Sequence, residues 1–174
     1  TQYQLASGNT LRSWVPLDKR PYRDGAVWLI QTVCAYIKET ADYKILDELI
    51  NYYDDDTSES LFNHCIRGME FLYGNTGAHG LCLWGGGDWN DSFDGAGLLL
   101  KGESVWLSIA TVKATNDFIE LLNEVGKSDF IDIYITKRNN LIQNIQKYGW
   151  DKDHYIYGIN DWNEKVGSYD TKEG

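Results

Sequence analysis

The chain has 174 residues, of which 43% are hydrophobic and 14% aromatic, so it can build one sizeable core and is too apolar to be disordered. Its formal net charge of -10, spread along the sequence, excludes a protein that binds nucleic acid through clustered Lys and Arg side chains. No apolar run is long enough to span a membrane, and the first residues lack the pattern of a signal peptide.

Three segments in the first half of the chain have the spacing of helices. Residues 24–40 repeat apolar side chains with the helical period, which predicts an amphipathic helix. A shorter stripe predicts a second helix in residues 43–53, before a solvated acidic turn. Asp56 and Glu59 have the spacing of a capping box, which predicts a third helix that ends near Gly74.

The second half begins with a long glycine-rich segment. Nine glycines fall in residues 74–102 without any sustained period, which predicts a loop. Helical spacing returns in residues 102–126 and 128–149, so we expect two more helices there. Short apolar alternation from His154 to Tyr157 is compatible with a strand or an irregular tail.

These elements predict a mainly α-helical fold of five helices, stacked as antiparallel pairs in one segment that covers residues 1–174. The chain begins and ends without a closing element, so we expect it to be part of a longer protein. A loop as long as 74–102 in a compact helical domain is usually functional or disordered, and this one is too rich in Trp and Leu for disorder. Functional residues are therefore expected there.

The loop contains three closely spaced aspartates, Asp88, Asp91 and Asp94, between aromatic side chains such as Trp89. An aspartate beside aromatic rings is expected to be partly desolvated, which raises its pKa and lets it hold a proton near neutral pH. A general acid requires this property. The high content of Trp and Tyr also fits a carbohydrate site, where flat rings contact sugars, although most of these rings are expected in the core.

The loop residues are also typical of structures other than a catalytic site. Asp and Asn in a glycine-rich segment are ordinary turn formers, and spacing alone favours that interpretation over a catalytic acid. A calcium loop starting at Asn90 is excluded, because Lys101 stands where a bidentate Glu is required. The sequence also has no G-x-S-x-G motif and no Walker motif, so neither a hydrolase triad nor a nucleotide site is predicted.

The three cysteines, Cys34, Cys65 and Cys82, form neither a CxxC pair nor a Cys/His metal pattern. We expect buried, reduced thiols, as in a cytoplasmic protein. The three histidines lack a Cys or Glu partner at ligand spacing, so no zinc site or other metal site is predicted.

The segments GGGDWNDSFDGAG and KGESVW resemble glycoside hydrolase family 94, which contains cellobiose, laminaribiose and chitobiose phosphorylases and related oligoglucan phosphorylases. VWLIQTVCAYIKETADYKILDE, KGESVWLSIATVKATNDFIELL and WDKDHYIYG resemble family segments in the same order. The resemblance covers most of residues 22–158. It implies an (α/α)6 barrel, of which this chain would form about half.

The resemblance also implies roles for the motif D-W-N-D. Its second aspartate is the general acid in the family, which is Asp91 here, and its tryptophan, Trp89, helps to bind sugar. Asp88 and Asn90, in the same motif, are expected to contribute to substrate binding. The implied reaction is inverting phosphorolysis of a β-linked glucose disaccharide or oligosaccharide. Asp91 protonates the glycosidic oxygen while phosphate attacks the anomeric carbon, which gives an α-sugar 1-phosphate.

Phosphate is a co-substrate in this reaction, and no cofactor is expected. Because phosphate is already anionic, no second carboxylate is needed as a base, in contrast to an inverting hydrolase. The family often dimerises, so a homodimer of the whole enzyme is also expected. The groups that grip the donor sugar and the phosphate lie outside this segment in the family, so this chain alone is expected to be inactive.

Two residues near the motif are candidates for supporting roles. Family members often read Ser-Asp-Asp where this chain reads Arg23, Asp24 and Gly25, which leaves the role of Asp24 open. Glu103 either orients the catalytic loop or supplies a negative charge at the N-terminus of the next helix, and the helix dipole favours the second interpretation.

Two other functions remain as alternatives. An inverting hydrolase on the same barrel would need a base carboxylate roughly 6.5–9.5 Å from the acid. A non-catalytic carbohydrate-binding or scaffold domain would not need Asp91 at all.

Overall fold

The computed structural model describes residues 2–12, 20, 22–93 and 95–171. Within this part of the chain the helices are α1 Gly25–Thr40, η1 Tyr43–Asp47, α2 Leu61–Gly74, η2 Asp91–Phe93, α3 Val105–Glu124, α4 Ser128–Asn144 and η3 Ile145–Gly149. The strands are β1 Gln2–Gln4, β2 Thr10–Arg12, β3 Leu49–Asn51, β4 Ser58–Ser60, β5 Glu103–Ser104, β6 Trp150–Asp151, β7 His154–Tyr155, β8 Gly158–Ile159 and β9 Lys165–Val166.

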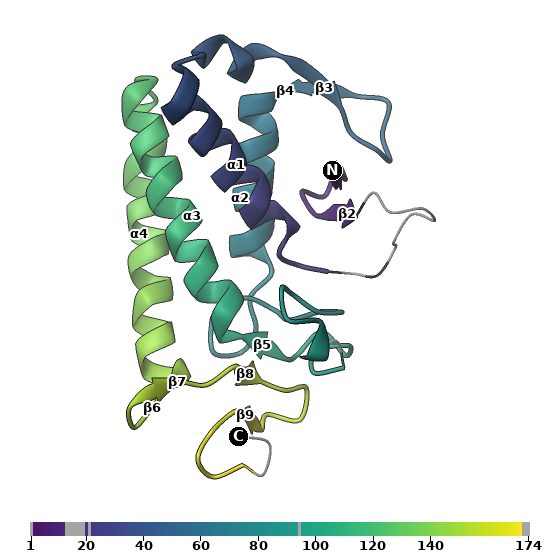
Figure 1. Cartoon of the computed structure of the whole chain (residues 1–174), viewed down its shortest axis with the longest axis vertical. Helices are drawn as coiled ribbons and strands as arrows, with labels where there is room; N and C mark the ends of the chain where they lie inside the picture. Colours follow the sequence, from purple (N-terminus) through teal and green to yellow (C-terminus); the bar gives the residue numbers. More distant parts are fainter. Residues whose placement is uncertain (1, 13–19, 21, 94, 172–174) are drawn as a thin grey trace.

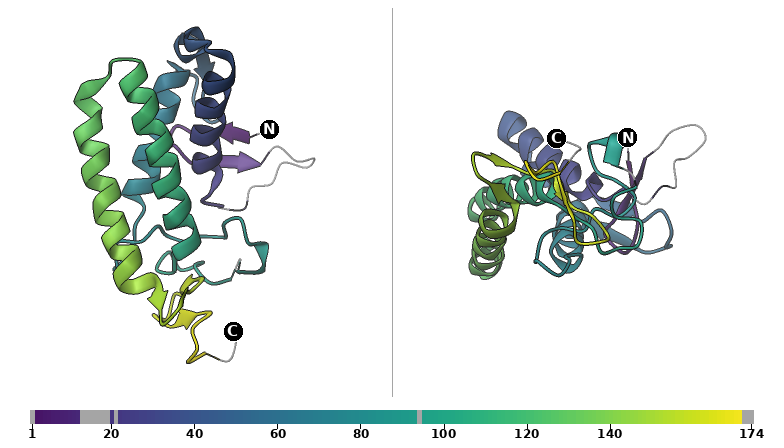
Figure 2. Two further views of the ribbon diagram at one scale, coloured as in Figure 1. Left: turned by 60° about the vertical axis from the view of Figure 1, so that its left-hand side comes forward. Right: turned by 90° about the horizontal axis from the view of Figure 1, so that it is seen from below.

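The four long helices lie along the long axis of the molecule (Figure 1). Helix α1 contacts both α2 and α3, and α3 contacts α4, so neighbours in space follow the order α2, α1, α3, α4. The pairs α1–α2 and α3–α4 are each antiparallel, as Figure 2 also shows. The predicted mainly helical fold of stacked antiparallel pairs is therefore confirmed, with four α-helices rather than five in the described residues.

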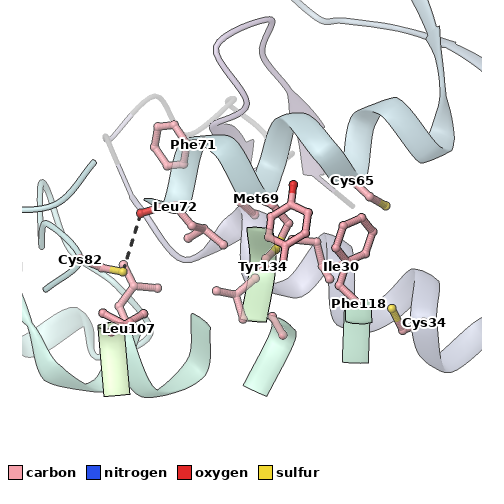
Figure 3. Packing of buried hydrophobic residues seen from close by; sticks show 14 of the residues in the cluster. Ile30, Cys34, Cys65, Met69, Phe71, Leu72, Cys82, Leu107, Phe118 and Tyr134 are labelled. Carbon is pink, nitrogen blue, oxygen red and sulfur yellow. Dashed lines mark hydrogen bonds between the residues drawn. The ribbon is translucent and has the colours of Figure 1, made fainter. Parts of the chain in front are cut away.

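The core lies between the apolar faces of these helices (Figure 3). Ile30 of α1, Met69 of α2 and Phe118 of α3 are fully buried. Tyr134 of α4 meets the Phe118 ring edge-on, with the ring centroids 5.3 Å apart. Burial of each large apolar side chain contributes about 1.5–3 kcal/mol. The helical period of the sequence thus identifies the faces that meet here.

All three cysteines are buried and unpaired, as predicted. Burial raises the pKa of the Cys34 thiol to about 11 and also raises the pKa values of Cys65 and Cys82. The reactive thiolate form is therefore disfavoured at neutral pH. These side chains act as small core residues (Figure 3).

The prediction of a helix in residues 43–53 is wrong. Only a short 3-10 helix, η1, forms, and β3 then pairs with β4 in an antiparallel hairpin. Leu46 alone of the expected stripe is well buried, at 5% exposure, whereas Leu49 is 73% exposed. A helix would gain little from burying so few side chains, so pairing with β4 determines the local structure.

The predicted capping box at Asp56 and Glu59 is also wrong. Helix α2 begins after Ser60, whose hydroxyl accepts a hydrogen bond from the backbone N–H of Asn63 (3.3 Å). The Glu59 carboxylate instead accepts a hydrogen bond from the Tyr52 hydroxyl across the hairpin (2.7 Å). A serine already at the N-cap position leaves no capping role for the residues before it.

The remaining helices lie where the sequence places them, since α2 ends at Gly74 and η3 extends α4 to Gly149. Small antiparallel sheets, β6–β7 and β5–β8–β9, lie at the lower end of the helical layer in Figure 1. Strand β7 settles the interpretation of His154 and Tyr155 in favour of a strand. Within the described residues, no helix combines the length and apolarity needed to cross a membrane.

Candidate active site

The glycine-rich segment between α2 and α3 is ordered by its own backbone. It lies at the end of the helical layer where α3 begins (Figure 1). Two isolated bridges, Thr76 with Cys82 and Leu83 with Glu103, fold it back along the start of α3. The N–H of Trp84 donates to the carbonyl of Gly102 (2.8 Å). The predicted loop is therefore confirmed as an irregular but hydrogen-bonded structure.

The triple glycine before the D-W-N-D motif is required by close packing. Gly85 and Gly87 have φ angles of 61° and 137°, where residues with a Cβ are strained. A Cβ on Gly85 would lie 2.5 Å from Nε of Arg23. The backbone N–H of Arg23 also donates to the carbonyl of Gly87 (3.1 Å). The segment that leads into α1 thus supports the start of the motif.

Asp88 is buried, with 1% of its surface exposed. One carboxylate oxygen accepts a hydrogen bond from the Ser104 hydroxyl (2.5 Å), and the other accepts one from the backbone N–H of Asn90 (3.0 Å). Burial raises the pKa of Asp88, the two hydrogen bonds oppose this, and the nearby charge of Asp24 adds to the increase. The carboxylate is therefore enclosed by protein.

Trp89 and Asp91, in contrast, face outward. Trp89 is 63% exposed, and its ring stacks on Trp106 of α3 with a centroid distance of 5.9 Å and an interplanar angle of 22°. The Asp91 side chain is 60% exposed, and its Oδ1 lies 3.5 Å from Nη1 of Arg12. The motif therefore directs one aromatic face and one carboxylate to solvent.

The expectation that Asp91 is partly desolvated by its aromatic neighbours is wrong for the described chain. Those rings pack elsewhere, because Trp89 lies on Trp106 and Phe93 lies on Trp84 and Tyr157. The desolvated carboxylate of the motif is that of Asp88. Asp94, the third aspartate of the segment, lies outside the described residues.

Arg12 and Tyr22 approach Asp91 from the N-terminal segment and were not predicted. The Arg12 guanidinium lies over the Tyr22 ring, 3.7 Å from its centroid. Burial raises the pKa of the Tyr22 hydroxyl, and the charge of Asp91 raises it further. Sequence spacing carried no signal for this contact, since the hairpin β1–β2 and the motif are far apart in the chain.

Asn90 forms part of a turn. Its side-chain oxygen accepts a hydrogen bond from the backbone N–H of Ser92 (3.1 Å), and its carbonyl accepts one from Phe93 (3.1 Å). Together with the bond from Asn90 to Asp88, this gives two successive Asx turns, with Trp89 in the middle of the first and Asp91 in the middle of the second. The turn-forming interpretation therefore holds for Asp88 and Asn90, and it is compatible with a catalytic role for Asp91.

The two supporting candidates differ. Asp24 is buried at the N-terminus of α1, where its carboxylate accepts a hydrogen bond from Nε1 of Trp28 (2.7 Å). Glu103 directs its carboxylate to the loop, which favours the loop-orienting interpretation over that of a charge at the start of α3. Its carboxylate accepts hydrogen bonds from the backbone N–H groups of His79 (3.0 Å) and Leu81 (3.1 Å), and it also binds Nδ1 of His79 (2.5 Å).

The exposed residues of the motif lie near a cationic side chain, that of Arg12. Among the described residues, no three His, Cys, Asp or Glu side chains come close enough to hold a metal ion. Trp89 offers a flat apolar face beside Asp91, and Arg12 offers a positive charge.

A family model described as Glycosyl hydrolase 94 superfamily, catalytic domain, matches residues 18–174. The chain is 40% identical over 174 residues to solabiose phosphorylase from Paenibacillus borealis. The matched region covers 99% of this chain and 22% of that protein. It is 30% identical over 172 residues to 3-O-beta-D-glucopyranosyl-beta-D-glucuronide phosphorylase of the same organism. This match covers 94% of this chain and 22% of that protein.

A third relative, N,N'-diacetylchitobiose phosphorylase from Vibrio proteolyticus, is 29% identical over 153 residues, which cover 87% of this chain and 18% of that protein. The chain thus spans about a fifth of the length of these relatives.

Proposed function

The chain belongs to the glycosyl hydrolase 94 superfamily, and we propose that it forms part of the catalytic domain of a glycoside phosphorylase. The proposed reaction is inverting phosphorolysis of a β-linked glucose disaccharide or oligosaccharide. The observation that carries this proposal is the pairing of an exposed carboxylate, Asp91, with an exposed indole, Trp89, on a loop that buried hydrogen bonds hold in place. Relatives named as phosphorylases match this chain along nearly all of its length.

In the proposed mechanism Asp91 is the general acid. The bond between the anomeric carbon and the glycosidic oxygen breaks as Asp91 gives its proton to that oxygen, and a phosphate oxygen forms the new bond from the opposite face. The products are an α-sugar 1-phosphate and a free sugar hydroxyl. Arg12, 3.5 Å from Asp91, stands where it stabilises the carboxylate left after proton transfer.

Trp89 is proposed to bind the sugar next to the scissile bond. Its stacking on Trp106 orients the ring before substrate arrives, so little side-chain entropy is lost on binding. Binding of a sugar and of the rest of the protein would remove water from Asp91, which strengthens electrostatic interactions at the site. We assign the groups that hold phosphate and most of the donor sugar to parts of the protein outside this chain.

We also propose the fold, the location and the oligomeric state of the whole enzyme. Helices α1–α4 supply four of the twelve helices of an (α/α)6 barrel, about a third rather than the half expected from the sequence. The enzyme works in the cytoplasm as a homodimer, and it uses phosphate as co-substrate without a cofactor. Residues 1–174 together contribute one segment of that barrel. An intact catalytic domain is therefore the form in which activity should be measured.

The test uses the whole protein with β-1,2-, β-1,3- and β-1,4-linked disaccharides, with and without phosphate. We expect α-sugar 1-phosphate, identified by phosphorus NMR, from at least one disaccharide and only when phosphate is present. Equal sugar release without phosphate would instead indicate a hydrolase. Asp91→Asn should lower kcat by about 10²–10⁴-fold, because the leaving oxygen loses its proton donor.

Asp132→Asn is the matched control, since Asp132 is an exposed aspartate on α4. It should retain the activity of the unmodified protein. If Asp91→Asn also retained full activity, the catalytic assignment would be wrong and a non-catalytic carbohydrate-binding role would be favoured.

A further inference from the structure

The four residues of the D-W-N-D motif divide into two that face solvent and two that hold the loop. Trp89 and Asp91 have more than half of their side chains exposed. Asp88 is 1% exposed, and Asn90 directs its side-chain oxygen to the backbone of Ser92. A carboxylate as enclosed as that of Asp88 has no open face for a sugar, so it does not fit the substrate-binding role expected from the sequence.

Asp88 belongs to a continuous chain of hydrogen bonds that joins the motif to helix α3. The N–H of Leu107, in the first turn of α3, donates to the Ser104 hydroxyl (2.9 Å), and that hydroxyl donates to Asp88 (2.5 Å). The other Asp88 oxygen receives the N–H of Asn90 (3.0 Å), directly before Asp91. Ser104 is fully buried and is the N-cap of α3.

Burial of the Asp88 carboxylate in this series of hydrogen bonds has an energetic cost. A buried carboxylate costs free energy that only well-placed donors offset, and a hydrophobic side chain would fill the same space without that cost. Asp24, also buried, adds a second negative charge nearby. The carboxylate contributes two directional hydrogen bonds, because its two oxygens accept from the Ser104 hydroxyl and the Asn90 N–H at the same time. A hydrophobic side chain could accept neither.

We propose that Asp88 is a positioning residue, which together with Ser104 fixes the loop to α3 so that Asp91 meets the glycosidic oxygen. The inference rests on the proposed function, because it concerns the placement of the proposed acid. Proton transfer requires hydrogen-bond distance between the acid and the leaving oxygen. A misplacement of a catalytic group by about 1 Å can reduce the rate by about 100-fold. Hydrogen bonds that fix the loop, and with it the Asp91 carboxylate, are therefore expected to affect kcat.

The experiment compares Asp88→Asn and Ser104→Ala in the whole protein with the best disaccharide substrate and phosphate. Asn at position 88 keeps the size of the side chain and one acceptor oxygen, while Ala at position 104 removes the donor and leaves Asp88 intact. Each change should lower kcat by about 10- to 100-fold, with KM altered by less than about threefold. A KM increase at unchanged kcat would show instead that Asp88 contacts substrate.

A double-mutant cycle shows whether Asp88 acts through Asp91. In the Asp91→Asn background, Asp88→Asn should lower the residual kcat by less than about twofold, because the group that it positions is already lost. An equally large effect in both backgrounds would overturn the inference and leave the proposed function intact. Full activity of Asp91→Asn by itself would overturn the proposed function.

Ser60→Ala is the matched control for loss of a helix N-cap. Ser60 caps α2 in the same way as Ser104 caps α3, with its hydroxyl accepting a hydrogen bond from the third backbone N–H, but it does not touch the loop. Both variants should lose thermal stability, and only Ser104→Ala should lose kcat. If Ser60→Ala lowered kcat equally, loss of stability would explain both results and the positioning role would be wrong.

Discussion

The helical layer and the loop between α2 and α3 are stabilised by different kinds of side chain. In the layer, buried apolar residues such as Ile30, Met69 and Phe118 meet across the helices. In and around the loop, three carboxylates, Asp88, Glu103 and Asp161, are each at most 8% exposed. Buried apolar area and complementary packing thus stabilise the layer of helices α1–α4. The loop is stabilised instead by a few buried carboxylates that accept hydrogen bonds.

The two residues of β5 show how closely the loop depends on these acceptors. Glu103 accepts hydrogen bonds from the backbone N–H groups of His79 and Leu81, and its neighbour Ser104 donates one to Asp88. Successive side chains of a strand point to opposite faces, so one short strand fixes both halves of the loop. Apolar packing tolerates changes that preserve volume, whereas a buried acceptor that loses its donor costs its full desolvation penalty.

The largest stability effect is therefore expected in the layer. Phe118→Ala removes a ring that is fully buried between Phe62 and Tyr134, and should lower the free energy of unfolding by about 3–5 kcal/mol. Calorimetry of the whole protein measures the shift in melting temperature. Phe118→Leu, the conservative control, should cost less than about 1.5 kcal/mol if shape in this region tolerates substitution.

At a temperature where both Phe118 variants remain folded, the kcat of each should be close to that of the unmodified protein. A large fall in kcat without unfolding would contradict the distinction between layer and loop, because it would show that packing in the layer determines the geometry of the loop directly.

A smaller and more local effect is expected from Asp161→Asn. Asp161 follows β8 and accepts backbone N–H groups from Leu99 (2.8 Å), Lys101 (3.0 Å) and Gly102 (2.9 Å). Hydrogen bonds to a charged group contribute about 1.5–3 kcal/mol, so the variant should destabilise the end of the loop by about this amount. Hydrogen exchange of the amides in residues 97–102 should accelerate, while exchange in α1 stays unchanged.

The pH dependence of this anchor has a definite sign. Burial raises the pKa of Asp161, but the three backbone donors outweigh it and the net pKa is lowered. A lowered pKa in the folded state adds stability above the ordinary aspartate pKa of about 3.9, and this stability is lost as the pH falls through the lowered value. Asp55→Asn is the matched control, since Asp55 is exposed and accepts one backbone N–H from Thr57. It should leave amide exchange in the loop unchanged at every pH.

The same difference explains how far the sequence predicts the fold. Apolar periodicity identifies the four helices because burial of one face is what stabilises them. It fails at residues 43–53, where the stripe exists but, of its members, only Leu46 is buried and Ile45 packs partly against the core. Sequence periodicity reports what a helix could bury, and the tertiary structure decides what it does bury.

The candidate site was predictable only in part. The motif and its glycines identify the loop and the residues Trp89 and Asp91, with the catalytic assignment resting on the family resemblance. Which aspartate is buried was not predictable, because the burial of Asp88 depends on Ser104, a contact that only the fold creates. The approach of Arg12 to Asp91 is hidden for the same reason.

The smallest effect is expected from the charged groups of the layer itself. Lys38 of α1 lies 2.7 Å from Glu120 and 3.5 Å from Asp117 of α3, and its side chain is 53% exposed. The hydrogen bond from Lys38 to Glu120 raises the pKa of its ammonium group, against a smaller effect of burial, and the charge of Asp117 raises it further. The resulting stability is complete below the ordinary lysine pKa of about 10.4 and is lost as the pH rises through the raised value.

Lys38→Met should therefore lower stability at pH 7 by only about 0.2–1 kcal/mol, because water screens exposed ion pairs. The difference between Lys38→Met and the unmodified protein should shrink further in 1 M salt, where the screening length is about 3 Å. Lys44→Met, at an exposed lysine of η1, is the matched control for the added apolar surface. The Asp161 anchor is buried and should keep its effect in salt, so a strong salt dependence of amide exchange at residues 97–102 would contradict the proposed distinction between layer and loop.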